Sequence, residues 1–339
     1  MEFLDHNCSN IHPKVYQFVA LGINQLFKNE DFNQTQIRTL SKLLLKEINN
    51  EKGRYIAQAM RCLLHSFHGP DADEYRPGLR PIVCTFIEAI KTVDADEEAL
   101  IPLLDGVNFW LEEDYRFSLQ ESAKMIAERI LHQNATVSQL ALDIFVHNAT
   151  QRCHEILQEI EFFQHLPTLL VQFEKKRKCR LYCLLGQHCN KGLASERQLS
   201  PILEILVDDL KQLSNFNVFF AFGYIILAVS HEDAIKLVLD FDCLTIFQKM
   251  MQIDRRKINF TDFMIIMRNI LVVGNKIAAN NECTYPFNPF AIRMAECGLL
   301  STIKSNDVDP LFISEYFGED FERYLLQKRC LNTKNAMKK

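Results

Sequence analysis

Apolar residues recur at helical spacing along much of the chain, in stretches that end at turn-forming residues. Between residues 151 and 173, Ile156, Ile160 and Phe163 fall on one helical stripe, and the pattern resumes after Pro167 with further leucines. Apolar positions three and four residues apart share one face of an α-helix. The segment therefore predicts a helix, a break near Pro167 and a second helix.

The segment from residue 234 to 251 has the same layout. Ile235 and Val238 precede a break at residues 240–242, where two aspartates flank a phenylalanine, and Phe247 belongs to the apolar stripe that follows. This pattern again predicts two helices joined by a short turn. Helix pairs of this kind are therefore expected to be the basic unit of the fold.

A longer period of about 40 residues runs through the chain. Four segments share an apolar start and a small or polar finish, and they are residues 145–150, 184–190, 225–230 and 270–275. Their ends are 40, 40 and 45 residues apart. The same interval leads back to 108–110 and 66–69, so about six units are expected. A unit of this length holds two or three helices, as in HEAT and armadillo arrays.

Composition agrees with an all-α fold. The chain has 339 residues, 48% of them hydrophobic, with 11 glycines and 10 prolines, which is few for a fold with many turns. We expect an N-terminal helical cap over residues 1–54, a repeat array over 55–305, and a C-terminal helix with a basic tail over 306–339. The longest apolar runs, such as 218–229, are shorter than the roughly 20 residues that span a bilayer, so no membrane segment is predicted.

Two parts of the chain resemble the armadillo repeat family, which includes the β-catenin and importin-α types. Residues 267–275 resemble the long third helix of an armadillo repeat, with Asn269 in the place of the family's asparagine, and residues 295–303 resemble the Gly-containing turn and helix that follow. Residues 221–227 and 240–244 repeat the arrangement more loosely. The resemblance implies a right-handed α-α superhelix whose groove binds another protein.

The chain departs from the importin-α pattern at the peptide-binding positions. In that type, repeated Trp and Asn residues on the third helices hold an extended basic peptide. Here the Asn position is taken by Asp143, Cys183, Tyr224 and Asn269 in successive units, and Arg268 stands at the Trp position. The resemblance therefore does not imply binding of nuclear-import signals. Residues 276–290 are longer than the family's turn and contain two prolines, and they form either part of a binding surface or a plain surface loop.

The sequence lacks the common motifs of catalysis and cofactor binding. It contains no Gly-rich phosphate loop, no nucleophile elbow and no His-Glu-x-x-His pair. Cys179, Cys183, His188 and Cys189 have metal-ligand chemistry, but one helix would spread them around its circumference, which favours buried thiols. We therefore expect no enzyme, no cofactor and no metal site.

A basic run at residues 174–180 is the clearest charged motif. Lys175, Lys176, Arg177 and Lys178 resemble a nuclear-localisation signal, and they could also contact an acidic partner or RNA. The alternative is a solvated turn between repeats. The net charge of -5 argues against a general affinity for nucleic acid, and the N-terminus lacks a secretory pattern, so an intracellular location in the nucleus or cytoplasm is expected.

The predicted function is that of a non-enzymatic adaptor that binds a peptide or helix of a partner protein along a concave groove. The candidate groove residues are Asp143, His147, Gln187, Tyr224, Arg268 and Asn269. For each of them a structural role between repeats is an open alternative. The competing function is nucleic-acid binding by a HEAT-like array, and self-association through the apolar N-terminal residues is a further alternative to simple capping.

Overall fold

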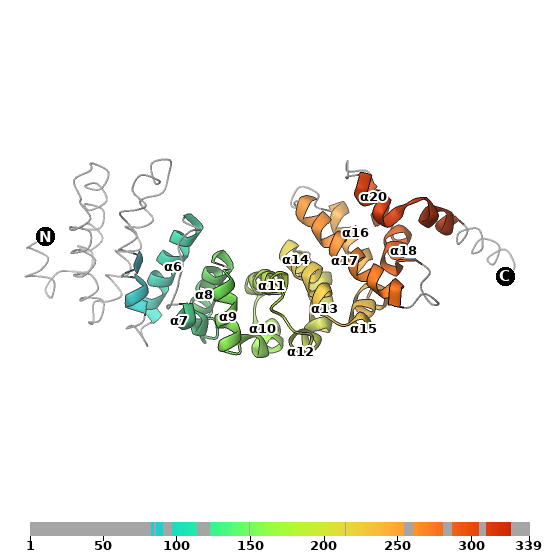
Figure 1. The fold of residues 1–339 in the computed structure, drawn as a ribbon. Helices are drawn as coiled ribbons and strands as arrows, with labels where there is room; N and C mark the ends of the chain where they lie inside the picture. The colour runs from blue at the N-terminus through green and yellow to red at the C-terminus, as the bar shows by residue number, and fades with distance from the viewer. Residues whose placement is uncertain are drawn as a thin grey trace, which may run out of the picture. The chain divides into compact units, whose positions relative to one another are not determined.

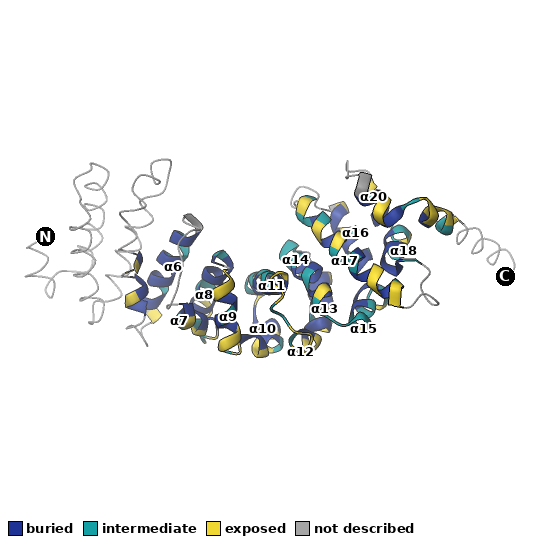
Figure 2. Ribbon diagram, viewed as in Figure 1, coloured by how far each residue is buried: buried dark blue, intermediate teal, exposed yellow. Residues whose placement is uncertain are grey.

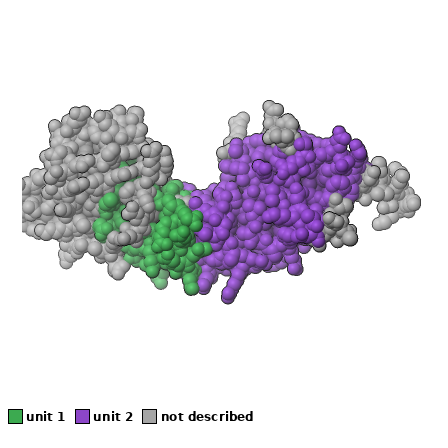
Figure 3. All heavy atoms as spheres, viewed as in Figure 1, with its two compact units in different colours: residues 1–162 green, residues 163–339 purple. Residues whose placement is uncertain are grey.

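The computed structural model describes residues 83–84, 86–90, 97–113, 123–148, 150–213, 215–253, 260–280, 287–304 and 310–326 (Figure 1). Every regular element in these ranges is a helix, which confirms the all-α prediction. The predicted cap over residues 1–54, the unit around residues 66–69 and the basic tail after residue 327 lie outside them. The chain divides into two compact units, residues 1–162 and 163–339, which are described separately (Figure 3).

Four helices are described in the first unit: α6 Glu97–Glu113, α7 Ala123–Arg129, α8 Ala135–His147 and α9 Gln151–Glu159. Helix α6 packs along α8, and α7 contacts both α8 and α9. Val107, Trp110 and Phe145 are buried between them. Asn134 begins α8, since its side chain accepts hydrogen bonds from the amides of Thr136 and Val137 at 2.9 and 3.3 Å.

Three helices of the second unit lie side by side in chain order: α11 Lys175–Asn190, α14 Phe216–Ala228 and α17 Phe260–Asn280. Glycines allow their close approach. A Cβ atom on Gly186 of α11 would lie 2.6 Å from the Phe220 ring of α14, and one on Gly223 of α14 would lie 2.7 Å from Ile266 of α17. A larger side chain at either position would have to displace these neighbouring side chains of the next helix.

A second layer runs parallel to the first in chain order: α10 Leu166–Gln172, α13 Leu203–Leu213, α16 Cys243–Ile253 and α19 Leu299–Lys304. Each of these helices contacts the next. Phe247 of α16 joins the layers, because its ring lies 4.3 Å from that of Phe219 and 5.0 Å from that of Phe222 on α14. The dark blue residues of Figure 2 mark this shared apolar core.

Shorter helices are among the other regular elements of the described residues from Phe162 onward. Their bounds are η3 Phe162–His165, α12 Glu196–Leu199, η4 Ser200–Ile202, α15 His231–Ile235, the π-helix η5 Lys236–Asp240, α18 Pro289–Glu296 and α20 Pro310–Phe317. Helix α20 lies inside the C-terminal segment predicted to be helical. Among the described residues, no helix combines the length and the apolar character needed to cross a bilayer.

The turn positions confirm one sequence prediction and correct another. Residues 231–240 and 243–253 are helical and the turn between them has Asp242 at φ 54°, as the pattern predicts. In the earlier segment the break falls at Ile160 and Glu161, where Glu161 has φ 54°, and not at Pro167. Pro167 instead lies in the first turn of α10, where its missing N–H costs no helical hydrogen bond.

Two segments predicted as turn or loop are more helical than expected. The basic residues 175–180 are not a turn between repeats, because they form the first turns of α11. Likewise α17 continues to Asn280 and α18 begins at Pro289, so much of the predicted loop 276–290 is helix. Its middle, residues 281–286, lies outside the described residues.

Candidate functional site

The layer formed by α11, α14 and α17 has one face that the second layer does not cover. Each helix carries on this face a pair of half-buried polar residues seven positions apart, which is the spacing of one helical face. The pairs are Arg180 and Gln187, Asn217 and Tyr224, and Asp262 and Asn269. We call the surface defined by these six residues the three-helix face.

An aromatic pair lies at the centre of the three-helix face. The rings of Phe220 and Tyr224 are 4.9 Å apart in an edge-to-face arrangement, and both side chains are half-buried. Phe220 lies over Gly186 of α11. The negative charge of Asp262 on α17 acts on Tyr224 and raises its pKa. The pair therefore spans all three helices.

The environment of Tyr224 keeps its hydroxyl protonated. Burial raises the pKa of Tyr224, and the negative charge of Asp262 raises it further. The residue thus offers an apolar ring together with a hydrogen-bond donor at neutral pH. Half-exposed aromatic residues with a polar tip are among the commonest energetic anchors of protein interfaces.

Four of the predicted groove residues lie in the second unit, where their surroundings differ. Gln187 and Tyr224 lie half-buried on the three-helix face. Asn269 donates a hydrogen bond from Nδ2 to the carbonyl oxygen of Gly223 at 3.0 Å, so it joins α17 to α14. Arg268 is exposed, and its positive charge acts on Tyr316 of α20.

The other two predicted groove residues lie in the first unit and are not part of the three-helix face. Nδ1 of His147 on α8 is hydrogen-bonded to Oδ1 of Asn108 on α6, at 3.0 Å. Asp143 is buried one turn earlier on α8. The contact of His147 joins α8 to α6, which is the structural alternative considered for that position.

Sequence reasoning missed Phe220 and Arg180. Phe220 belongs to the long apolar run at 218–229, which by itself does not distinguish it from core residues. Its position four residues before Tyr224 places both rings on one face of a helix. Arg180 closes the basic run and stands seven residues before Gln187. Helical spacing relative to the predicted groove residues was the signal that could have found both.

Two members of the basic run have structural partners. The Lys178 ammonium lies 3.0 Å from Oδ1 of Asp209, a buried residue of α13, and the Tyr182 hydroxyl donates to Oδ2 of the same carboxylate at 2.9 Å. The Arg177 guanidinium lies 4.4 Å from the centre of the Phe173 ring. Lys178 and Arg177 are therefore less available to a ligand than the sequence suggests.

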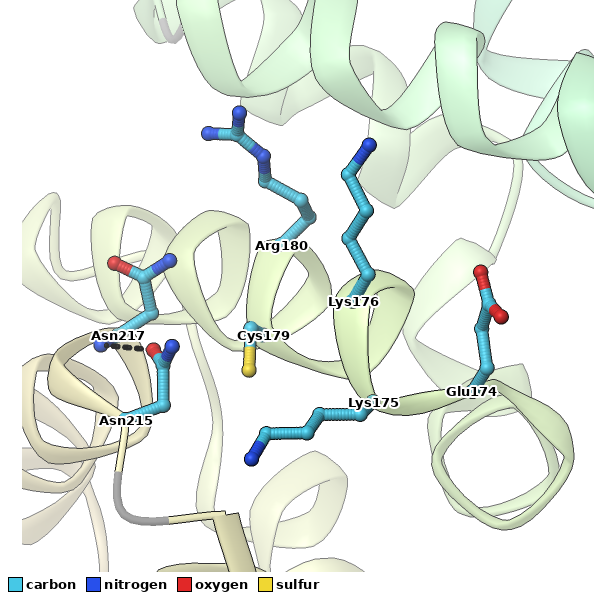
Figure 4. A pocket seen from close by; sticks show the side chains of 7 residues that line it. All are labelled: Glu174, Lys175, Lys176, Cys179, Arg180, Asn215 and Asn217. Atoms are coloured by element: carbon cyan, nitrogen blue, oxygen red, sulfur yellow. Dashed lines mark hydrogen bonds between the residues drawn. The ribbon is translucent and has the colours of Figure 1, made fainter.

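The remaining basic residues line an open cavity of about 640 Å³ at the start of α11 and α14 (Figure 4). Its lining consists of Glu174, Lys175, Lys176, Cys179, Arg180, Asn215 and Asn217. Figure 4 shows Lys175 extending past Cys179 toward Asn215, while Lys176 and Arg180 extend together in another direction. Asn215 begins α14 by accepting a hydrogen bond from the amide of Asn217 at 2.8 Å. We call this cavity the basic cavity.

The cysteines and histidine of α11 have the character of core residues. The His188 ring is buried and stacks on Phe163, with ring centres 3.9 Å apart. Burial raises the pKa of Cys179 and of Cys183, and it raises the pKa of Cys189 to about 12, so the thiols stay neutral at physiological pH. The described residues contain no group of three or more His, Cys, Asp or Glu side chains placed to hold a metal ion.

Neither the comparison with protein-family models nor the comparison with curated proteins finds a match to this sequence. Among solved structures, an engineered protein from the Northeast Structural Genomics Consortium matches with a TM-score of 0.51 and 12% identity, over 69% of this chain and 96% of that chain. A second engineered protein matches with a TM-score of 0.48 and 13% identity, over 69% and 98%. The first likeness concerns the helical fold alone and carries no function to this chain.

Proposed function

We propose that this chain is a non-enzymatic adaptor that binds a segment of another protein on the three-helix face. The observation that carries this proposal is the half-exposed pair Phe220 and Tyr224, which spans the three helices. A large aromatic surface left open on a packed layer is stabilised when a partner side chain covers it.

The proposal includes a right-handed armadillo-like superhelix as the architecture. The support is the regular order of packing in the second unit, where α11, α14 and α17 form one layer and α10, α13, α16 and α19 form the other. An array built from such repeated helix pairs presents the same helix of each unit on one surface. Continuous surfaces of that kind suit elongated partners.

The dimensions of the face favour a short segment. Packed helices are about 9 Å apart, so three of them span about 18 Å between the outer axes. An extended chain covers that distance with about five or six residues. A partner peptide therefore crosses α11, α14 and α17 with one or two side chains beside the aromatic pair.

The test starts from a random peptide library displayed on phage and selected against the wild-type chain. Selected peptides are then measured by fluorescence polarisation with the wild type and a Phe220→Ala/Tyr224→Ala variant. Truncating two anchors is expected to weaken binding by roughly 30-fold or more, since a hot-spot side chain contributes about 2 kcal/mol. Circular dichroism establishes whether the variant is as helical as the wild type.

The matched control is Phe241→Ala, which truncates a half-buried aromatic residue outside the three-helix face. This variant is expected to bind the selected peptides like the wild type. If the double variant, while folded, also binds them like the wild type, the binding site lies elsewhere and the proposal is wrong.

A further inference from the structure

The first turn of α11 is electrostatically unfavourable for the helix itself. Its first four residues are Lys175, Lys176, Arg177 and Lys178, and the turn contains no acidic residue. The N-terminal end of a helix carries a partial positive charge, so cations there destabilise the helix by about 0.3–1 kcal/mol each. Glu174, the residue at the N-cap, offsets part of this cost, and locally unfavourable residues are common at functional surfaces.

The charges at this end are not all neutralised within the chain. Lys178 pairs with Asp209 and Arg177 stacks on Phe173. By contrast, Lys175 and Lys176 are exposed and form no ion pair with any residue that the structure describes. The lining of the basic cavity therefore includes two lysines, Lys175 and Lys176, without an ion pair among the described residues, together with Arg180 and one carboxylate, that of Glu174.

The basic cavity is continuous with the three-helix face, because residues of that face form part of its lining. Arg180 and Asn217 belong to both. Asn217 stands seven residues before Tyr224 on α14, which places them about 10 Å apart along the helix axis. A ligand that covers the aromatic pair can thus reach the basic cavity with a group about three extended residues away.

We propose that the segment bound on the three-helix face is acidic, and that its Asp or Glu carboxylates enter the basic cavity while an apolar side chain packs against Phe220 and Tyr224. This inference rests on the proposed function and adds the chemistry of the partner. The side-chain amides of Asn215 and Asn217 supply hydrogen bonds to the peptide backbone or to the carboxylates.

Charge and composition favour an acidic peptide over nucleic acid. Proteins that bind nucleic acid strongly neutralise about 6–10 phosphates along a basic stripe. Here three basic residues line one cavity, where they extend in two directions (Figure 4), in a chain with net charge -5. The aromatic pair is part of the adjoining three-helix face, so an apolar side chain of a peptide can pack against it while acidic side chains contact the basic residues.

The experiment compares the peptides selected by the wild type with those selected by a Lys175→Glu/Lys176→Glu variant. The wild type is expected to enrich Asp or Glu about three residues from an apolar residue. The affinity of an enriched acidic peptide is then compared with that of the same peptide carrying Gln and Asn in place of Glu and Asp. We expect the acidic form to bind at least about tenfold more tightly to the wild type, with a strong loss at high salt.

The charge-reversed variant separates a binding role from a structural one. Acidic residues in the first turn of a helix are favourable, so its midpoint of thermal unfolding is expected to rise or stay the same while its affinity for the acidic peptide falls at least about tenfold. Lys211→Glu/Lys249→Glu, which reverses two exposed lysines on α13 and α16, is the matched control and is expected to leave the affinity unchanged.

The possible failures are distinguishable. If peptides bind in a way that depends on Phe220 and Tyr224 but show no acidic preference, the inference is overturned and the proposed function stands. If no selected peptide depends on the aromatic pair, the proposed function fails. If a fluorescent RNA or DNA duplex of arbitrary sequence binds the wild type more tightly than the acidic peptide and displaces it, the ligand of the basic cavity is nucleic acid and the inference is overturned.

Discussion

At the scale of single residues, identical residue types serve different purposes according to what packs against them. Lys175 and Lys178 are three positions apart on α11, yet one is exposed and the other lies 3.0 Å from a carboxylate that is only 3% exposed. Gly186 and Gly223 both permit close helix contacts, but the side chains they face differ in their freedom to move. These differences lead to three predictions.

Asp209 is expected to be important for stability. Asp209→Ala leaves the ammonium of Lys178 and the buried hydroxyl of Tyr182 without the acceptor they share. Removing one partner of a buried ion pair costs roughly 3 kcal/mol. Urea unfolding should therefore show a loss of about that size, whereas Asp208→Ala, which removes an exposed neighbour, should change the unfolding free energy by less than about 0.5 kcal/mol. Equal effects of the two substitutions would contradict the prediction.

Gly223→Ala is expected to destabilise the second unit. The new Cβ would lie 2.7–3.0 Å from three atoms of Ile266, a buried residue of α17 with little room to move. Overpacking of this kind costs about 1–3 kcal/mol, and the better helix propensity of Ala offsets up to about 1 kcal/mol of it. Chemical denaturation checks the prediction, and a more stable variant would show that the α14 and α17 contact is looser than described.

Gly186→Ala is expected to act on binding more than on stability. The two atoms nearest its Cβ would belong to the half-buried Phe220 ring, which has more freedom to move than the buried Ile266, and the third is Cα of Ala221 at 3.0 Å. The unfolding free energy should change by less than about 1 kcal/mol, while affinity for peptides selected on the wild type falls because an anchor is displaced. Denaturation and fluorescence polarisation on the same samples test this, and an unchanged affinity would remove Phe220 from the binding site.

At the scale of elements, ion pairs and hydrogen bonds join helices that are distant in the sequence. Asp242, in the turn after η5, accepts two hydrogen bonds from Arg293 of α18 at 2.9 and 2.7 Å and one from the Thr245 hydroxyl at 2.9 Å. Burial alone would raise the pKa of Asp242, but these hydrogen bonds and the charge of Arg293 outweigh burial and lower it. This link between elements is therefore sensitive to pH.

The effect of Arg293→Met is expected to depend on pH. A carboxylate whose pKa is lowered in the folded state contributes stability above its unfolded pKa of about 3.9 and loses that contribution as pH falls through the folded value. At neutral pH the substitution should cost about 1 kcal/mol, a small value because both side chains are about one-third exposed. The cost should shrink as pH falls below about 4. A constant difference between variant and wild type would show that packing alone is responsible.

Arg323→Met is the matched control for that experiment. Arg323 pairs with Glu319 and Asp320, and all three side chains are mostly exposed. Pairs of this kind contribute little to stability, so the variant is expected to match the wild type throughout the pH series. Thermal unfolding followed by circular dichroism serves for both variants.

At the scale of the whole molecule, each of the two compact units has its own buried core. In the second unit each helix contacts mainly the helices next to it in the two layers, and these contacts lie within the unit. A fragment of residues 163–339 is therefore expected to unfold in one cooperative urea transition and to bind the selected peptides within about threefold of the full chain. A gradual transition without a defined midpoint would show that the unit depends on the rest of the chain.

The sequence by itself determined the fold class, the positions of several helices and some of the turns. The break after Asp240 follows from local chemistry, because apolar spacing and turn residues act over only a few positions. The break near Pro167 was predicted a few residues too late, since Pro fits the first turn of a helix as well as the end of one. The basic run was predicted as a turn or linear signal, although it begins a helix.

Only the tertiary structure decided which side chains of those helices are open to a partner. Helical spacing places Phe220 and Tyr224 on one face, but that Phe220 stands over Gly186 depends on how closely α11 and α14 pack. Likewise, Lys178 differs from the exposed lysines beside it because it forms an ion pair with Asp209 on α13. Burial and pairing arise between residues distant in sequence, whereas the sequence pattern reports on near neighbours, and this is why the helices could be predicted and the binding face could not.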